Sequence, residues 1–167
     1  MKTNIRISIY LSLAAILWTA ALAGPAGAAE KLVPFSGSLQ AHEPFVFEGP
    51  PPGTLVVSGS GDGIATHLGR FTLTWAFRVN VADGTGAGTV TFIAANGDQL
   101  FTTSVGSSEP LDTPGVFRIV EIQTILGGTG RLANAKGSFV VERLTDLNTG
   151  FTSGSFHGTM TSPGSAK

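Results

Sequence analysis

The segment RFTLTWAFRVNV, residues 70–81, alternates apolar and polar side chains along its whole length. One face of this segment is apolar and consists of Phe71, Leu73, Trp75, Phe77, Val79 and Val81. The opposite face carries mainly arginine, threonine and asparagine. Because side chains in a β-strand point alternately to the two faces of a sheet, this pattern predicts a long strand with one buried face.

Turn signals join this strand to two more. Asp83-Gly84 precedes a strand-like run at residues 87–95, and Asn96-Gly97 follows that run. Asn-Gly favours positive φ at both central positions of a tight turn and so predicts a hairpin onto residues 98–106. Five other runs have the same character, at residues 33–42, 54–60, 116–126, 137–144 and 151–161. The total is eight predicted strands, and no segment shows a sustained period of 3.6 residues.

The predicted fold class is therefore all-β: an eight-stranded antiparallel, calycin-like barrel, with a two-sheet sandwich as the alternative. Closure of a barrel removes the unpaired strand edges that an exported sheet otherwise has to protect. Residues 43–53, which include three consecutive prolines, are expected to form a linker or lid whose Phe45 and Phe47 cover a barrel end. The 23 glycines, about twice the average share, are expected to mark turns and bulges.

The amino terminus has the pattern of a secretory signal peptide. Lys2 and Arg6 precede an apolar run at residues 7–23, and the small residues Ala26-Gly27-Ala28 follow. This pattern predicts a signal peptide over residues 1–28, cleaved there or one residue later. An uncleaved membrane anchor is disfavoured, because the run is shorter than the roughly 20 residues that span a bilayer. We expect the protein to be secreted or periplasmic.

The remaining chain, residues 29–167, is expected to form a single barrel domain. Without Lys2 and Arg6 it carries eight basic and 11 acidic side chains, a net charge of −3, and it has no basic run. Nucleic acid is therefore not an expected partner, and neither is a stable membrane anchor. The absence of cysteine excludes disulfides, a cysteine nucleophile and thiolate metal sites. No cofactor is predicted.

Residues 128–133, GTGRLA, fit the G-x-G-x-x-A form of a dinucleotide-binding turn. Such a turn requires a preceding strand and a following helix, whose N-terminus faces the pyrophosphate. Here a strand-like run at residues 137–144 follows instead. The glycines are therefore interpreted as a tight structural loop.

The same loop resembles a family signature. GGTGRLANAKGSF, residues 127–139, resembles the Gly-Gly-Thr-Gly-(Lys/Arg)-Phe-x-x-Ala-x-Gly signature of dirigent proteins and is similar to the Gly-Gly-Ser-Gly-x-Phe turn of allene oxide cyclases. The matching glycines are Gly127, Gly128, Gly130 and Gly137, and Leu132 replaces the usual aromatic residue. Both families form eight-stranded antiparallel barrels. The resemblance, which covers about a dozen residues, implies a distant, bacterial-type secreted member of this superfamily.

The resemblance also implies function. In these families, polar groups in the barrel cavity steer a reactive intermediate, and the proteins are often trimers, so it implies self-association as a homo-oligomer. Glu121 lies upstream of the loop, as an acidic residue does in dirigent proteins, but its spacing is one residue longer. Because strands alternate with period two, Glu121 would face the lumen only if a bulge intervened. Glu121 is the candidate catalytic residue.

Read without the family, few residues can carry chemistry. The candidate ligand-binding residues are Trp75, Phe77, His67 and Arg143. The alternatives are that His67 is a strand-end histidine bonded to backbone, that the aromatic residues are ordinary core, and that Glu121 and Arg143 form a structural ion pair or face solvent. The three histidines of the mature chain lack paired-ligand spacing, and no metal site is predicted.

Three functions remain open. The first is an exported barrel that binds a small hydrophobic molecule in its lumen without catalysis, since eight-stranded barrels can hold one small ligand. The second is a cyclase- or dirigent-like enzyme that steers ring closure or coupling of a reactive intermediate. The third is a structural or interaction protein whose lumen is packed.

Overall fold

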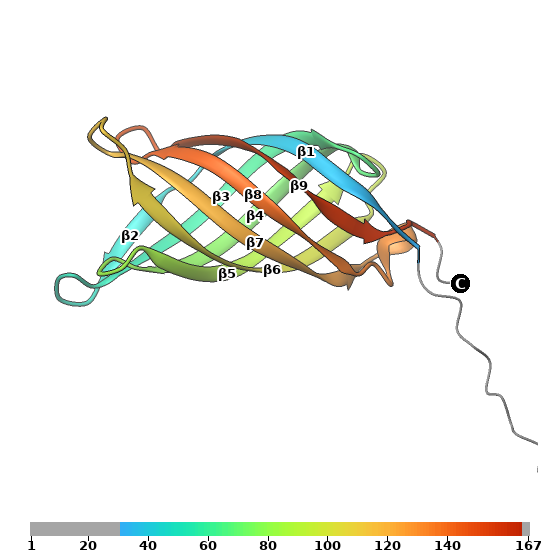
Figure 1. Ribbon diagram of the computed structural model, residues 1–167, viewed down its shortest axis with the longest axis horizontal. Helices are drawn as coiled ribbons and strands as arrows, with labels where there is room; N and C mark the ends of the chain where they lie inside the picture. The colour runs from blue at the N-terminus through green and yellow to red at the C-terminus, as the bar shows by residue number, and fades with distance from the viewer. Residues whose placement is uncertain (1–30, 165–167) are drawn as a thin grey trace, which may run out of the picture.

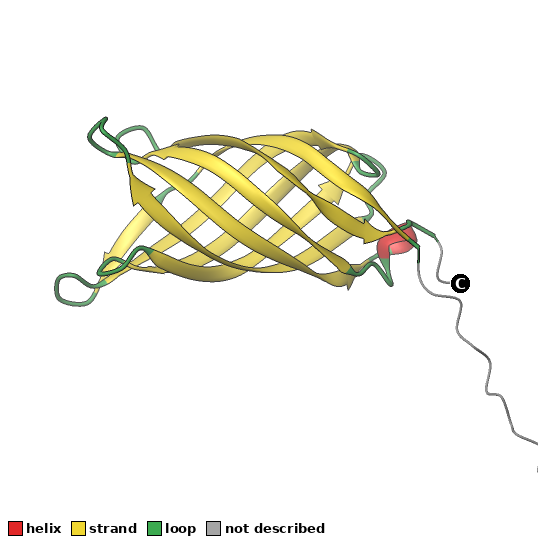
Figure 2. Ribbon diagram, viewed as in Figure 1, coloured by secondary structure: helices red, strands yellow, loops and turns green. Residues whose placement is uncertain are grey.

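The computed structural model describes residues 31–164, which form a closed antiparallel β-barrel (Figure 1). The strands are β1 (Leu32–His42), β2 (Phe45–Glu48), β3 (Thr54–Ala65), β4 (Gly69–Asn80), β5 (Thr85–Ala94), β6 (Gln99–Pro110), β7 (Val116–Gly128), β8 (Gly137–Asp146) and β9 (Phe151–Thr161). The single helical turn within the described residues is the 3-10 helix η1 (Gly130–Leu132; Figure 2). The all-β prediction and all eight predicted strands are confirmed. The predicted signal peptide lies outside the described residues.

Eight strands close the barrel, and β2 is an additional ninth. Strands β3 to β9 follow one another in order, β9 pairs with β1, and β1 closes the ring by pairing with β3. This closure rules out the two-sheet sandwich.

The expectation that residues 43–53 form a linker or lid is wrong in part. Phe45–Glu48 forms β2, which pairs with Thr54 to Val57 at the start of β3. Strand β1 pairs with the other end of β3. The chain leaves the strand conformation at Glu43 and Pro44, which separate β1 from β2. The two short pairings together cover β3, whose first half would otherwise be an open edge.

One end of the barrel is filled with aromatic rings. This phenylalanine cluster consists of Phe35, Phe71, Phe92, Phe139 and Phe156, each at most 3% exposed. Neighbouring ring centroids lie 5.0 to 6.2 Å apart, in tilted or edge-to-face arrangements, as aromatic pairs prefer. The cluster lies in the half of the lumen nearer to η1, which we call the closed end. The opposite end, which carries β2, is the open end.

The expectation that the glycines mark turns and bulges is right only in part, because many glycines lie inside strands. Gly84 and Gly97 do occupy turns with positive φ, 71° and 86°. On the inner face, however, a Cβ at Gly59 would overlap the indole of Trp75, and one at Gly154 would lie 2.5 Å from the Cβ of Arg143. Glycine here makes room for a large side chain on the neighbouring strand.

The glycine loop, residues 127–137, connects β7 to β8 at the closed end. After η1 the chain returns directly to a strand, as the structural interpretation of the loop requires. Asp98 anchors the loop from the β5–β6 turn, because its Oδ2 accepts hydrogen bonds from the backbone N–H of Arg131 at 3.3 Å and from its Nε at 3.0 Å. Gly130 has a φ of 53°, and a Cβ there would collide with Asp98.

The titration of Asp98 provides a test of this anchor. The side-chain hydrogen bond from Asn96, followed by that from Arg131, holds the pKa of Asp98 below its ordinary value. Since the folded pKa is below the unfolded one, this carboxylate contributes stability at neutral pH that is lost as the pH falls through the folded pKa. We expect Asn96→Ala to raise the pKa of Asp98 in an NMR titration.

Asp146, at the other end of the barrel, serves as the internal control. Its pKa is lowered by hydrogen bonds from the Asn148 backbone and from Thr149, so Asn96→Ala should leave it unchanged. An unchanged Asp98 titration would show that the contacts of Asn96 are not maintained in solution.

Candidate functional site

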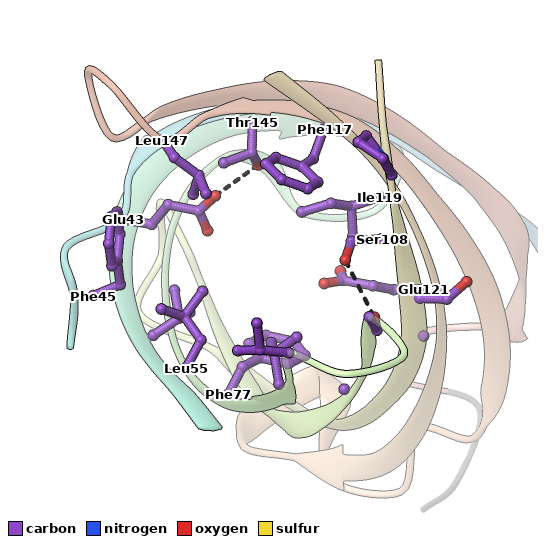
Figure 3. Close-up of a pocket in the computed structure, with 18 of the residues that line it drawn as sticks. Glu43, Phe45, Leu55, Phe77, Ser108, Phe117, Ile119, Glu121, Thr145 and Leu147 are labelled. Carbon is purple, nitrogen blue, oxygen red and sulfur yellow. Dashed lines mark hydrogen bonds between the residues drawn. The ribbon is translucent and has the colours of Figure 1, made fainter. Parts of the chain in front are cut away.

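A cavity of about 480 Å³ occupies the lumen at the open end (Figure 3). Its walls are largely apolar and include Phe45, Leu55, Val57, Phe77, Phe117 and Ile119. The volume lies within the range of small-molecule sites. The lumen is therefore packed in only one half.

The cavity exists because the inward-facing side chains of β5 and β6 become smaller toward the open end. Near the closed end these strands place Phe92 and Leu100 inward, both at most 1% exposed. Near the open end the corresponding inward positions on β5 and β6 are Gly86 and Gly106, which line the cavity. Removal of side-chain volume from two neighbouring strands leaves space that the opposite wall does not fill.

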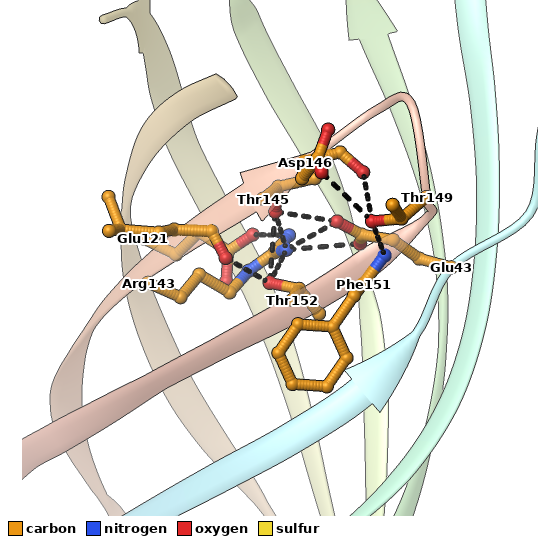
Figure 4. Close-up of polar contacts among 9 residues, drawn as sticks. Glu43, Glu121, Arg143, Thr145, Asp146, Thr149, Phe151 and Thr152 are labelled. Atoms are coloured by element: carbon orange, nitrogen blue, oxygen red, sulfur yellow. Dashed lines mark hydrogen bonds and ion pairs between the residues drawn. The ribbon is translucent and has the colours of Figure 1, made fainter. Parts of the chain in front are cut away.

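A buried polar cluster forms the base of the cavity (Figure 4). Its members are Glu43, Glu121, Arg143, Thr145 and Thr152, each at most 8% exposed. They come from the β1–β2 break and from three adjacent strands, β7, β8 and β9. Period-two alternation points all of the strand residues inward.

Arg143 is the centre of this cluster. Its Nη1 donates to Glu43 at 2.8 Å (Oε1) and 3.0 Å (Oε2), and its Nη2 donates to Oε1 of Glu121 at 3.0 Å. The two threonine hydroxyls lie 2.8 and 2.9 Å from Nη1. Thr145 also donates to Oε1 of Glu43 at 2.6 Å. One guanidinium thus holds two carboxylates that are distant in sequence.

The electrostatics keep Arg143 charged. Burial alone would lower the pKa of its guanidinium, but the attraction of Glu121 and Glu43 and their hydrogen bonds outweigh burial and raise the pKa. The guanidinium carbon also lies 5.7 Å from the ring centroid of Trp75, within the range of a cation–π contact.

The two carboxylates are bound unequally. Both oxygens of Glu43 accept hydrogen bonds, whereas for Glu121 only Oε1 has a hydrogen-bond partner among residues 31–164. Glu121 lines the cavity and extends toward its middle in Figure 3. Its second oxygen is therefore available to a molecule in the cavity, because a carboxylate can accept several hydrogen bonds.

A second polar layer separates the cluster from the packed half. Gln123 accepts a hydrogen bond from Thr102 at 2.7 Å and donates one to Ser104 at 2.9 Å. Trp75 lies beside this layer, and its Nε1 is the single buried side-chain polar atom in residues 31–164 that lacks a hydrogen-bond partner. The lumen thus changes from apolar cavity to polar cluster and then to aromatic core.

The structure brings together two of the residues predicted from the sequence. Glu121 and Arg143 meet in the polar cluster, and Phe77 lines the cavity. Trp75 faces the lumen on the closed-end side of the cavity and is not part of the cavity lining. His67 is at the closed end, in the β3–β4 turn, where its Nε2 lies 3.1 Å from the carbonyl oxygen of Pro34. It does not line the cavity and matches the alternative of a strand-end histidine bonded to backbone.

The inward orientation of Glu121 is consistent with the bulge that its spacing required. The β6–β7 pairing shifts register between Phe101 and Thr102, which face Gly127 and Ile125. One extra residue of β7, Leu126, is thereby inserted between Glu121 and the glycine loop. The loop glycines, Gly127, Gly128, Gly130 and Gly137, lie between β7 and β8 at the end of the barrel opposite the cavity.

Sequence reasoning missed Glu43, Thr145 and Thr152. A signal for Glu43 was present, because extending the alternation of Phe35, Leu39 and Ala41 by two residues places Glu43 on the inner face. The proline that follows Glu43 obscured this signal, since the strand breaks there. The two threonines carry no sequence signal that separates them from the many others in the strands.

Within residues 31–164, no group of three or more His, Cys, Asp or Glu side chains is arranged to hold a metal ion. None of the helices in the described part of the chain is long and apolar enough to cross a membrane.

Comparisons with family models, with curated proteins and with solved structures were made for this chain. None of the three found a match.

Proposed function

We propose that this protein is an exported barrel of the allene oxide cyclase and dirigent-like type that binds a small hydrophobic molecule in its lumen without catalysis. The observation that carries the proposal is the cavity of about 480 Å³, which is apolar in its walls and open to solvent at one end. Release of water from such walls favours an apolar ligand, by about 25 cal/mol per Å² of apolar surface buried.

Two further features support the proposal. The phenylalanine cluster closes the other end of the lumen, so a ligand enters and leaves only through the open end. The polar cluster supplies a few fixed hydrogen-bonding groups at the base of the cavity, which is typical of small-molecule sites. The glycine loop and the eight-stranded closure support the superfamily assignment.

Two isoleucines on β7 provide a matched test of the site. Ile119 lines the cavity, whereas Ile122 lies on the outer face and is 53% exposed. We expect the larger side chain of Ile119→Trp to fill part of the cavity. Binding of the neutral fluorescent probe N-phenyl-1-naphthylamine should weaken by about tenfold or more, because the probe loses apolar contact equivalent to a few buried methylene groups. Binding is measured by fluorescence titration.

The control, Ile122→Trp, makes the same substitution three residues away and should bind the probe like the unchanged protein. Equal binding by the Ile119→Trp variant would place the apolar site outside the cavity and contradict the proposal.

A second candidate function is that of a cyclase- or dirigent-like enzyme. The observation that favours it is the position of Glu121. A buried carboxylate with one free oxygen at the base of an apolar cavity can act as a general acid or base. The two functions differ in the fate of the bound compound, because a binding protein releases its ligand chemically unchanged. Mass spectrometry of compounds released from the protein distinguishes them.

A further inference from the structure

We propose that the ligand of the cavity is an apolar molecule with a positively charged head group, such as a protonated amine, which is held at Glu121. This inference rests on the proposed function, because it assigns the chemistry of the ligand in that same cavity.

The first argument is the charge of the cavity. Its lining contains the acidic residues Glu43, Asp83 and Glu121 but only one basic residue, Arg143. Asp83 lies at the mouth, where hydrogen bonds from Thr85 lower its pKa and keep it ionised at neutral pH. The lining therefore carries an excess of negative charge, which attracts cations and repels anions.

The second argument is the uneven pairing inside the polar cluster. Arg143 is engaged by both oxygens of Glu43 through Nη1, and it reaches Glu121 through Nη2 alone. With both buried carboxylates ionised, one guanidinium balances only one of them, and a unit of negative charge remains. Burying a charge without a full partner costs free energy, and a cationic head group beside Glu121 removes that cost.

The third argument is geometric. Glu121 is 6% exposed and belongs both to the lining of the cavity and to the polar cluster. A carboxylate accepts hydrogen bonds and donates none, so it selects a head group with N–H or O–H donors. Of these, an ammonium group also neutralises the charge.

The test uses three compounds with the same alkyl chain: decylammonium, decanol and decanoate. Each compound is titrated into the purified protein with bound N-phenyl-1-naphthylamine at neutral pH, and displacement of the probe is measured. The concentration of each compound stays below that at which it forms micelles. We expect decylammonium to displace the probe at about a tenfold lower concentration than decanol, as expected for a charge-assisted hydrogen bond. Decanoate should be the weakest of the three.

Glu121→Gln removes the charge but keeps the shape, and it should bring decylammonium and decanol to nearly equal affinity. The matched control is Glu142→Gln, which changes the net charge equally on the outer face of β8, where Glu142 pairs with Arg118. The control should keep the tenfold preference. If Glu121→Gln does not fold, the ranking of the three compounds on the unchanged protein still decides the question.

The outcomes separate the two proposals. Decanoate binding as tightly as decylammonium, or tighter, would overturn the cationic head group and leave apolar binding intact. Failure of the neutral probe and of all three compounds to bind would overturn the proposed function itself.

Discussion

Arg143→Met is expected to destabilise the protein by about 3–5 kcal/mol, the cost of breaking a buried ion pair by removing one partner. The side chain of Arg143 is 7% exposed and, among residues 31–164, it is the one cation bonded to Glu43 and Glu121. Without it, the two carboxylates remain in the lumen with no opposite charge, and Thr145 and Thr152 lose a shared donor. Urea denaturation followed by circular dichroism measures the loss.

Arg118→Met is the control for this substitution. Arg118 pairs with Glu142 at 3.3 Å on the outer face, with both side chains about half exposed. An exposed pair contributes about 0–1 kcal/mol, so the control should be nearly neutral.

The combined variant Glu43→Gln, Glu121→Gln, Arg143→Met removes all three charges and should recover much of the stability, because no uncompensated charge remains. Equal losses for Arg143→Met and Arg118→Met would mean that the polar cluster is solvated and does not contain a buried ion pair.

Phe156→Ala is expected to cost about 3–5 kcal/mol, as truncation of a buried aromatic residue does. Phe156 is 2% exposed, and its ring contacts the four other rings of the phenylalanine cluster. No neighbouring strand can move inward to fill the space, because each is held on both sides in the closed barrel. The midpoint of urea denaturation measures the effect.

Phe151→Ala makes the same change on the same strand at a residue that is 48% exposed. It should alter stability by about 0.5 kcal/mol or less. Since the phenylalanine cluster and the cavity occupy different halves of the lumen, the folded fraction of Phe156→Ala should still bind the neutral probe. Similar losses for the two substitutions would contradict the assignment of the cluster as the core.

The fold was largely predictable because alternation is a local property. In residues 70–81 the side chains predicted to face inward include Phe71, Trp75 and Phe77, and all three are buried. Val81 follows the end of β4 at Asn80 and is 40% exposed, and it lines the cavity at the open end. Asn96-Gly97 lies in the predicted turn between β5 and β6, but Gly97 alone has positive φ, 86°, so the expectation of positive φ at both positions is wrong.

The site was less predictable because it depends on register around the ring. Glu43 and Arg143 are one hundred residues apart in the chain, yet they meet in the lumen. Glu121 faces the lumen with a bulge between it and the glycine loop, and its sequence spacing could not decide between the two faces. His67, although placed at the start of a strand, lies at the closed end.

By itself, the sequence determined the all-β class, the number of barrel strands and which face of most strands is buried, because these follow from side-chain period and turn chemistry along the chain. Only the tertiary structure decided which inward residues share a level of the lumen. Inward glycines and large side chains on neighbouring strands leave a cavity at one end and a packed core at the other. Hydrogen-bond register and barrel closure determine which residues of different strands lie at the same height in the lumen, and neither is encoded within a single strand.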